Sequence, residues 1–335
     1  MRSHVTFLSA AVAVVFLAGC SSQQLQTGNS ALPGSASMAI HSKYDLPPSG
    51  IRPAIPGPTP VPAPVQPSSW QWSLFVDNYD FAAPSVELFK NGTWVANGSF
   101  NNGATFPGSN WSDQKYLYVA NWSLGNGANV EEYRPNHTTP VFTYTNGLPD
   151  VANVSTQVLS GVHYVFVAGR GSGFVNEYKR DTNTIVAACY PGGNVFGVAV
   201  APNGNVFVDY DDSNNVGHIV EYLGGLGGCN GTLLPVTFGT VDGMVLDNAG
   251  RLVICDERNA VVDIIDPPYT SISGTLGSGY VVPVFVSINA NNSLAFVTDQ
   301  GQQEVRVLHY PSGALIQTIF VSAPGGAVEW TNYGF

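Results

Sequence analysis

Charged residues are scarce in this 335-residue sequence, where only 10% are Asp, Glu, Lys or Arg. Basic residues are the scarcer class, with 12 Lys and Arg against 23 Asp and Glu, and the formal net charge is −11. Nucleic-acid phosphates would be repelled by this balance, so a nucleic-acid partner is excluded. The surface must therefore be built mainly from uncharged polar residues such as Asn, Ser, Thr, Gly and Tyr.

Long apolar runs are missing after the first twenty residues, because no later stretch reaches the ~18 consecutive apolar residues of a spanning helix. The start of the chain is different. Arg2 precedes an apolar segment over 5–16, and Leu17-Ala18-Gly19-Cys20 follows it. This is the layout of an export signal over 1–19.

The end of that signal resembles the lipobox of bacterial lipoproteins. The resemblance implies cleavage before Cys20 and acylation of Cys20, for example with palmitate, so that several chains hold the protein on a membrane. Ser21 after the cysteine resembles the outer-membrane sorting choice of Gram-negative lipoproteins. We expect a lipid-anchored protein of the bacterial cell envelope, with the outer membrane favoured if the host is Gram-negative. An ordinary secretory signal with a chance cysteine is the alternative.

A proline-rich segment follows, and residues 20–69 are expected to form a lipidated, disordered tether. Nine prolines fall between positions 47 and 67. Such a run cannot pair as strands and favours polyproline II, which makes a semi-stiff spacer. Recognition of the segment by an aromatic groove is the alternative.

Catalytic signatures are also missing: the sequence has no G-x-S-x-G elbow, P-loop or HExxH motif. Gly169 to Gly173 reads as a glycine-rich turn. No two histidines have the short spacing of shared metal ligands; they are His4, His41, His137, His163, His218 and His309.

What the sequence does contain is a repeat. A short apolar strand pattern recurs six times, as LFVDN ending at Asn78, LYVAN at Asn121, VFVAG at Gly169, VFVDY at Tyr210, LVICD at Asp256 and AFVTD at Asp299. The successive spacings are 43, 48, 41, 46 and 43 residues, and turn clusters such as that at 247–250 precede the strands. This period predicts an all-β, six-bladed β-propeller over 70–335 with four strands in each blade.

The two ends of the repeat region predict how the ring closes. The first copy has no hairpin partner before it, and an orphan strand pattern, GGAVEWTN, ends the chain. We expect residues 327–331 to lie beside residues 73–76 and to complete the first blade, which removes two open sheet edges.

The copies DGMVLDNAGRLVICD and GVAVAPNGNVFVDY resemble the NHL repeat and its relatives among six-bladed, TolB-like propellers. The resemblance implies the fold but no function, because propellers serve as scaffolds, receptors and enzymes.

Polar residues end four of the repeated strands, at Asn78, Asn121, Asp256 and Asp299. They could form a ring of ligands around the central channel. We favour a structural role in which each side chain accepts hydrogen bonds from the backbone of a turn.

A divalent cation is considered because gluconolactonase- and regucalcin-type propellers bind one at the channel mouth. The corresponding positions here are Pro107, Ser155, Phe196, Asp242, Phe285 and a residue near Gly325. One carboxylate is a poor site for a cation that needs about six oxygens, although Asn153 and Asn194 could assist Asp242. A metal-assisted lactonase or lyase therefore stays an alternative, and no catalytic residue is assigned.

Two further hypotheses concern cysteine and tryptophan. Cys189 and Cys229 could form a disulfide, with Cys255 a buried free thiol. Trp94, Trp111 and Trp122 could offer a platform for a glycan, or could pack between blades. The function expected first is a monomeric binding or interaction module for an unknown protein or glycan partner.

Overall fold

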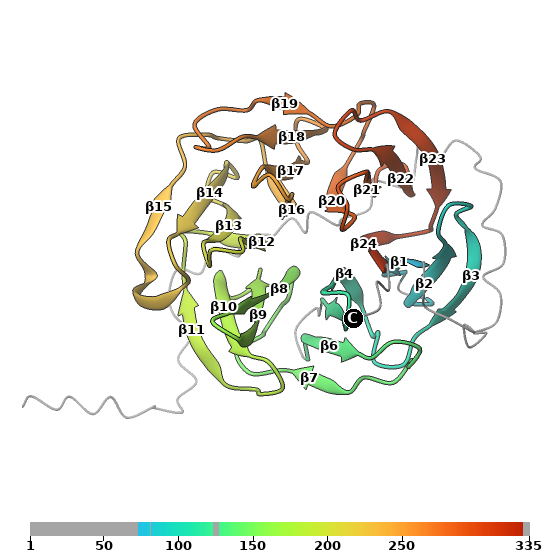
Figure 1. The fold of residues 1–335 in the computed structure, drawn as a ribbon, viewed down its shortest axis with the longest axis horizontal. Coiled ribbons are helices and arrows are strands. Elements are labelled where there is room, and N and C mark those ends of the chain that lie inside the picture. Colours follow the sequence, from blue (N-terminus) through green and yellow to red (C-terminus); the bar gives the residue numbers. More distant parts are fainter. Residues whose placement is uncertain (1–72, 81, 123–126, 331–335) are drawn as a thin grey trace, which may run out of the picture. The chain divides into compact units, whose positions relative to one another are not determined.

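The computed structural model describes residues 73–80, 82–122 and 127–330. Six four-stranded antiparallel sheets follow one another around a ring, as predicted (Figure 1). Residues 1–72, with the expected signal, Cys20 and the tether, lie outside the described part. In the part that is described, no helix combines the length and the apolar character needed to cross a bilayer.

Each sheet is one blade, and its strands are given from the channel outward. Blade 1 consists of β24 (Pro324–Trp330), β1 (Ser73–Asn78), β2 (Ser85–Lys90) and β3 (Val95–Phe100). Blade 2 consists of β4 (Pro107–Ser112), β5 (Leu117–Asn121), β6 (Asn129–Tyr133) and β7 (Phe142–Tyr144). Blade 3 consists of β8 (Asn153–Leu159), β9 (Val162–Gly169), β10 (Phe174–Lys179) and β11 (Ile185–Cys189). Blade 4 consists of β12 (Asn194–Val200), β13 (Val206–Asp211), β14 (Gly217–Tyr222) and β15 (Gly231–Leu233). Blade 5 consists of β16 (Val241–Leu246), β17 (Leu252–Asp256), β18 (Val261–Ile265) and β19 (Gly274–Thr275). Blade 6 consists of β20 (Pro283–Ile288), β21 (Leu294–Asp299), β22 (Glu304–His309) and β23 (Leu315–Phe320).

The repeated apolar pattern is the second strand of every blade, and these strands form the core. β5 and β17 are buried along their whole length, because sheets pack on both of their faces. The hairpin before β17 turns as the sequence predicts. Asp247 Oδ1 accepts hydrogen bonds from Ala249 N at 2.9 Å and Arg251 N at 2.8 Å, and Gly250 has φ 78°.

The last strand closes the ring by completing the first blade. β24 pairs antiparallel with β1, and Val76 lies opposite Ala327 while Ser73 lies opposite Trp330. Trp330 is fully buried, and its ring packs edge-on against Phe75 at 6.2 Å. The predicted closure is therefore confirmed for 327–330, while residue 331 lies outside the described part.

The antiparallel order gives the propeller two faces. We call the face where the six innermost strands begin the mouth face; the six second strands end there. The opposite face, where the second strands begin, is the rear face. Ser73, the first described residue, lies on the rear face in blade 1, opposite Lys90.

Candidate binding surface at the channel mouth

The acidic and amide residues that end the second strands act as clamps within their own blades. Asp256 accepts hydrogen bonds from Gly239 N at 2.8 Å and from Asn259 N at 3.1 Å. Asp299 accepts from Val281 N at 2.8 Å and Val282 N at 2.9 Å. Each carboxylate thus ties the loop that enters the innermost strand to the end of the second strand.

The amides do the same in blades 1 and 2. Asn121 accepts a hydrogen bond from Phe106 N at 3.2 Å and donates to Gly103 O at 2.9 Å. Asn78 accepts from Asp80 N and from Ser322 Oγ, both at 3.2 Å. The favoured structural interpretation of these four residues is confirmed, because their oxygens are used by their own loops.

The candidate metal residues lie on three neighbouring innermost strands. Asp242 on β16 and Asn153 on β8 are buried, and Asn194 at the start of β12 is exposed. Within residues 73–80, 82–122 and 127–330, no group of three or more His, Cys, Asp or Glu side chains could hold a metal ion. Asp242 therefore belongs to no such group of three among the described residues.

The three candidate tryptophans lie mainly between blades. Trp94 is 5% exposed, and its ring meets Phe296 of blade 6 edge-on at 5.5 Å. Trp111 donates from Nε1 to Thr156 Oγ1 of blade 3 at 3.0 Å. Trp122 is 7% exposed. Trp94 and Trp122 consequently leave little ring surface on which a sugar could stack.

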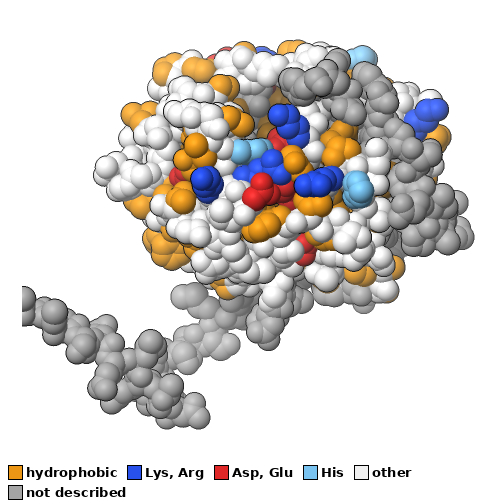
Figure 2. Space-filling view, turned by 60° about the horizontal axis from the view of Figure 1, so that its bottom comes forward, with side chains coloured by type: hydrophobic (Ala, Val, Ile, Leu, Met, Phe, Trp, Pro, Cys, Tyr) orange, Lys and Arg blue, Asp and Glu red, His pale blue; other side chains and the backbone are white. Residues whose placement is uncertain are grey.

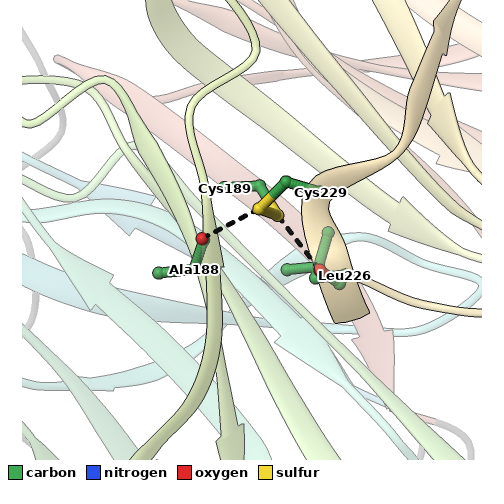
Figure 3. The surroundings of a disulfide bond; sticks show 4 residues. All are labelled: Ala188, Cys189, Leu226 and Cys229. Atoms are coloured by element: carbon green, nitrogen blue, oxygen red, sulfur yellow. Dashed lines mark hydrogen bonds between the residues drawn. A yellow bond between two sulfur atoms is a disulfide. The ribbon is translucent and has the colours of Figure 1, made fainter. Parts of the chain in front are cut away.

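Cys189 and Cys229 are joined by a disulfide (Figure 3). Cys189 ends β11, the outermost strand of blade 3, and Cys229 lies in a short 3-10 segment, η1 (Gly227–Cys229), of blade 4. The bond therefore joins neighbouring blades at the outside of the ring. The remaining described cysteine, Cys255, is a buried free thiol.

A row of aromatic rings and one arginine runs across the mouth face of blades 1 to 4. Tyr79 contacts Phe106 at 6.2 Å between ring centroids, and Phe106 contacts Trp122 at 5.8 Å. The Arg170 guanidinium lies over Trp122 at 5.1 Å and over Phe196 at 5.4 Å. We call these five residues the mouth row.

Asp242 adds a negative charge near the mouth row. Burial and the charge of Asp242 both raise the pKa of Tyr79, in that order of importance, so the phenol is neutral at physiological pH. The mouth row therefore combines a guanidinium, a neutral phenol and a nearby carboxylate with large apolar rings.

An exposed aromatic pair lies beside Arg170. Phe174 and Tyr190 are 40% and 57% exposed, and their ring centroids are 5.7 Å apart. Phe174 begins the strand that follows the Arg170 turn, and Tyr190 follows β11. Tyr79, Trp122, Arg170 and Phe196 of the mouth row are buried, so the surface open to a ligand here is the exposed pair, which the mouth row supports from beneath.

Most of this surface was not predicted from the sequence. Residues 169–173 have the composition of a plain glycine-rich turn, and Tyr79, Phe106 and Phe196 are conspicuous only when four blades are brought together. The available signal was position, because Tyr79, Trp122 and Arg170 each directly follow a second strand.

Comparisons with known proteins identify the fold. No family model matches the chain, and no curated protein matches it. Among solved structures 1328 chains match, so the architecture is widespread. One is a chain from the crystal structure of a nidogen/laminin complex, with a TM-score of 0.63 and 14% identity over 78% of this chain and 98% of that chain. At that identity the likeness shows a shared six-bladed propeller fold.

Proposed function

We propose that this chain is a lipid-anchored binding module of the cell envelope, related to NHL-repeat and TolB-like propellers, whose mouth face holds a protein partner. The lipobox-like ending at Cys20 and the proline-rich tether support the anchor. The closed ring supports the binding role, since a rigid scaffold holds its surface loops in fixed positions.

The observation that carries the proposal is the exposed pair, Phe174 and Tyr190, beside the turn that holds the buried Arg170 between two rings. Trp, Tyr and Arg are the residues most enriched in binding hot spots. Large rings supply buried area at low entropic cost, and a guanidinium stacked on rings keeps its hydrogen-bonding edge directed. The matched solved chain belongs to a nidogen/laminin complex, so a propeller of this fold takes part in a two-protein assembly there.

A protein partner is preferred to a glycan for a specific reason. The exposed rings, Phe174 and Tyr190, are tilted by 54° to each other, so they do not form one flat stacking platform. Side chains of a folded partner can fill such an angled surface, because protein interfaces are built from interdigitating residues.

Photo-crosslinking at the mouth face tests the binding role. A benzophenone amino acid placed at Tyr190 is expected to crosslink a discrete envelope protein in cells. The same amino acid at Val186 on β11, which is 51% exposed, serves as the matched control and should not crosslink that protein. Adding Arg170→Ala to the Tyr190 probe should weaken the crosslink severalfold. Equal crosslinking from both positions would refute the mouth face as the binding surface.

Fractionation tests the anchor separately. The unchanged chain is expected in the membrane fraction, and Cys20→Ser should move it to the soluble fraction. Retention of the Cys20→Ser chain after a high-salt wash would show that lipid on Cys20 is not what holds the protein.

A further inference from the structure

Charged side chains gather on the rear face where blades 2 and 3 meet. The link between these blades is Arg180, whose Nε and Nη2 donate to Glu132 Oε1 at 3.1 and 2.6 Å. Its guanidinium also lies 3.5 Å from the centre of the Tyr116 ring. The Glu132 side chain is fully buried, so the Arg180 charge is matched inside the protein.

Exposed cations surround this neutralised pair. Lys115 adjoins Tyr116, Arg134 lies two residues after Glu132, and Lys179 precedes Arg180; all three are exposed. His137 is exposed as well, in a turn in which its N–H donates to Arg134 O at 3.1 Å. Figure 2 shows Lys, Arg and His side chains gathered around a few acidic ones on one part of the surface.

The acids of this region offset the cations only in part. Asp113 is 3.2 Å from His163 Nε2 and has a side-chain exposure of 13%. Asp181 is the exposed acid, at 64%, and lies 3.7 Å from Arg180. Lys115, Arg134 and Lys179 are exposed, and Asp181 is the exposed acid beside Arg180, in a chain of net charge −11.

Two apolar side chains project from the same surface. Val141 is 41% exposed, and its N–H donates to Glu132 O at 2.7 Å. Val158 is 55% exposed and lies opposite His163 in the β8–β9 ladder. We call Lys115, Arg134, Lys179, Val141 and Val158 the rear patch. Cations beside projecting aliphatic groups are the features by which proteins attach to an anionic membrane surface.

The place where the chain enters the propeller lies on the same face. Ser73 begins β1 on the rear face, and blade 1 is the neighbour of blade 2 (Figure 1). The segment that leads back towards Cys20 therefore joins the propeller on the face that carries the rear patch.

We propose that the rear patch docks on anionic phospholipid headgroups of the membrane that holds the anchor, which leaves the mouth face turned away from the bilayer. The cations pair with headgroup phosphates, and the valines enter the interfacial layer. Each cation near such a surface contributes about fivefold to binding. The presence of a membrane nearby rests on the proposed anchor, but the headgroup affinity does not.

Vesicle binding by the full chain carrying Cys20→Ser tests the docking without the lipid. Vesicles of 30% phosphatidylglycerol in phosphatidylcholine, sedimented at low salt, are expected to carry down the protein, and pure phosphatidylcholine vesicles are not. Lys179→Glu should weaken binding about tenfold or more, and Lys115→Glu combined with it should weaken binding further. Arg258→Glu, an exposed residue of the mouth face, is the matched control and should change binding less than twofold. Unchanged melting temperatures would show that the variants are folded.

Three results would overturn the docking proposal. They are absence of binding to the anionic vesicles, equal losses for Lys179→Glu and Arg258→Glu, and binding to soluble dextran sulfate without binding to vesicles. Failure of the anchor gives a different result, because the unchanged chain would then be soluble in cells while Cys20→Ser protein still bound anionic vesicles.

Discussion

At the scale of single residues, the stability of the mouth face depends on carboxylates that accept hydrogen bonds from backbone N–H groups. Asp256 is 1% exposed, and its two oxygens receive Gly239 N and Asn259 N. Donors shielded from solvent that lose their acceptor are only partly compensated by water, so such a residue costs more to remove than a surface acid does.

Removal of one clamp should therefore destabilise the propeller. Asp256→Ala is expected to lower the free energy of unfolding by about 1–3 kcal/mol, because it removes a buried acceptor shared by part-buried backbone N–H groups. Asp266→Ala, at an exposed position at the start of the loop after β18, should change it by less than about 0.5 kcal/mol. Urea unfolding curves measure both, and equal midpoints for the two variants would contradict the clamp.

A neighbouring acid should make stability depend on pH. Burial, and then the charge of Asp256, raise the pKa of Asp263 to about 6. The folded state therefore keeps a proton on Asp263 at pH values where the unfolded state has released it, near pH 4 and above. The stability that depends on this protonated carboxyl is present in full below pH 4 and is lost as the pH rises to about 6.

Asp263→Asn should flatten that dependence. We expect the variant to be more stable than the unchanged protein at pH 7 by about 1–2 kcal/mol, and the difference to shrink towards pH 4. Thermal unfolding across pH 4–7 measures the effect. A difference that stays constant over this range would show that Asp263 does not titrate there.

At the scale of strands, the ring is held by a pairing between the two ends of the repeat region. β24 provides the innermost strand of blade 1 and also contacts the innermost strands of both neighbouring blades, β4 and β20. Its loss would open blade 1 and both adjoining interfaces together, so the effect should be global.

Truncation tests this closure. Deletion of residues 326–335 removes most of β24 and should lower the melting temperature of the whole propeller by 10 °C or more, or prevent folding, because exposed strand edges also favour aggregation. Deletion of residues 331–335 leaves β24 intact and is the control. A normal main transition with only a small early phase would indicate local fraying instead.

The disulfide provides a second link between elements. Cys189 and Cys229 are 40 residues apart, and a closed loop of this size stabilises the folded state by about 2–4 kcal/mol. Reduction should lower the melting temperature accordingly. Denatured, unreduced Cys20→Ser protein should titrate one free thiol, that of Cys255, and three would refute the bridge.

At the scale of the whole molecule, the two faces differ in chemistry. The mouth face carries rings, Arg170 and the clamping acids, whereas the rear face between blades 2 and 3 carries exposed lysine and arginine. The sequence distributes its few cations unevenly along the chain, but only the packing of blade 3 against blade 2 places Arg180 over Tyr116, the neighbour of Lys115 in the chain.

A metal screen tests the whole molecule for the alternative enzyme function. Calcium, magnesium, manganese and zinc are each expected to leave the melting temperature unchanged, because a cation bound only to the folded state would raise it. The described residues offer Asp242 no group of three or more His, Cys, Asp or Glu ligands. A shift that Asp242→Ala abolishes would restore the metal-assisted lactonase or lyase.

The sequence by itself determined the strands, the blade count and the closure, because these depend on patterns that repeat along the chain. An apolar run, a turn such as 247–250 and the next apolar run lie within fifteen residues, and local strand propensity together with the turn residues decides their pairing. The strand-end acids followed the same period, so their clamping role could be argued from spacing.

Only the tertiary structure decided the two surfaces. Arg170, Trp122 and Phe196 come from three blades and share no local pattern. Lys115 and Lys179 of the rear patch come from two blades and share none either. Which residues meet across blades depends on the rotation between packed sheets and on how deeply each side chain is buried. Both are properties of the closed ring, and neither is encoded in the spacing within one repeat.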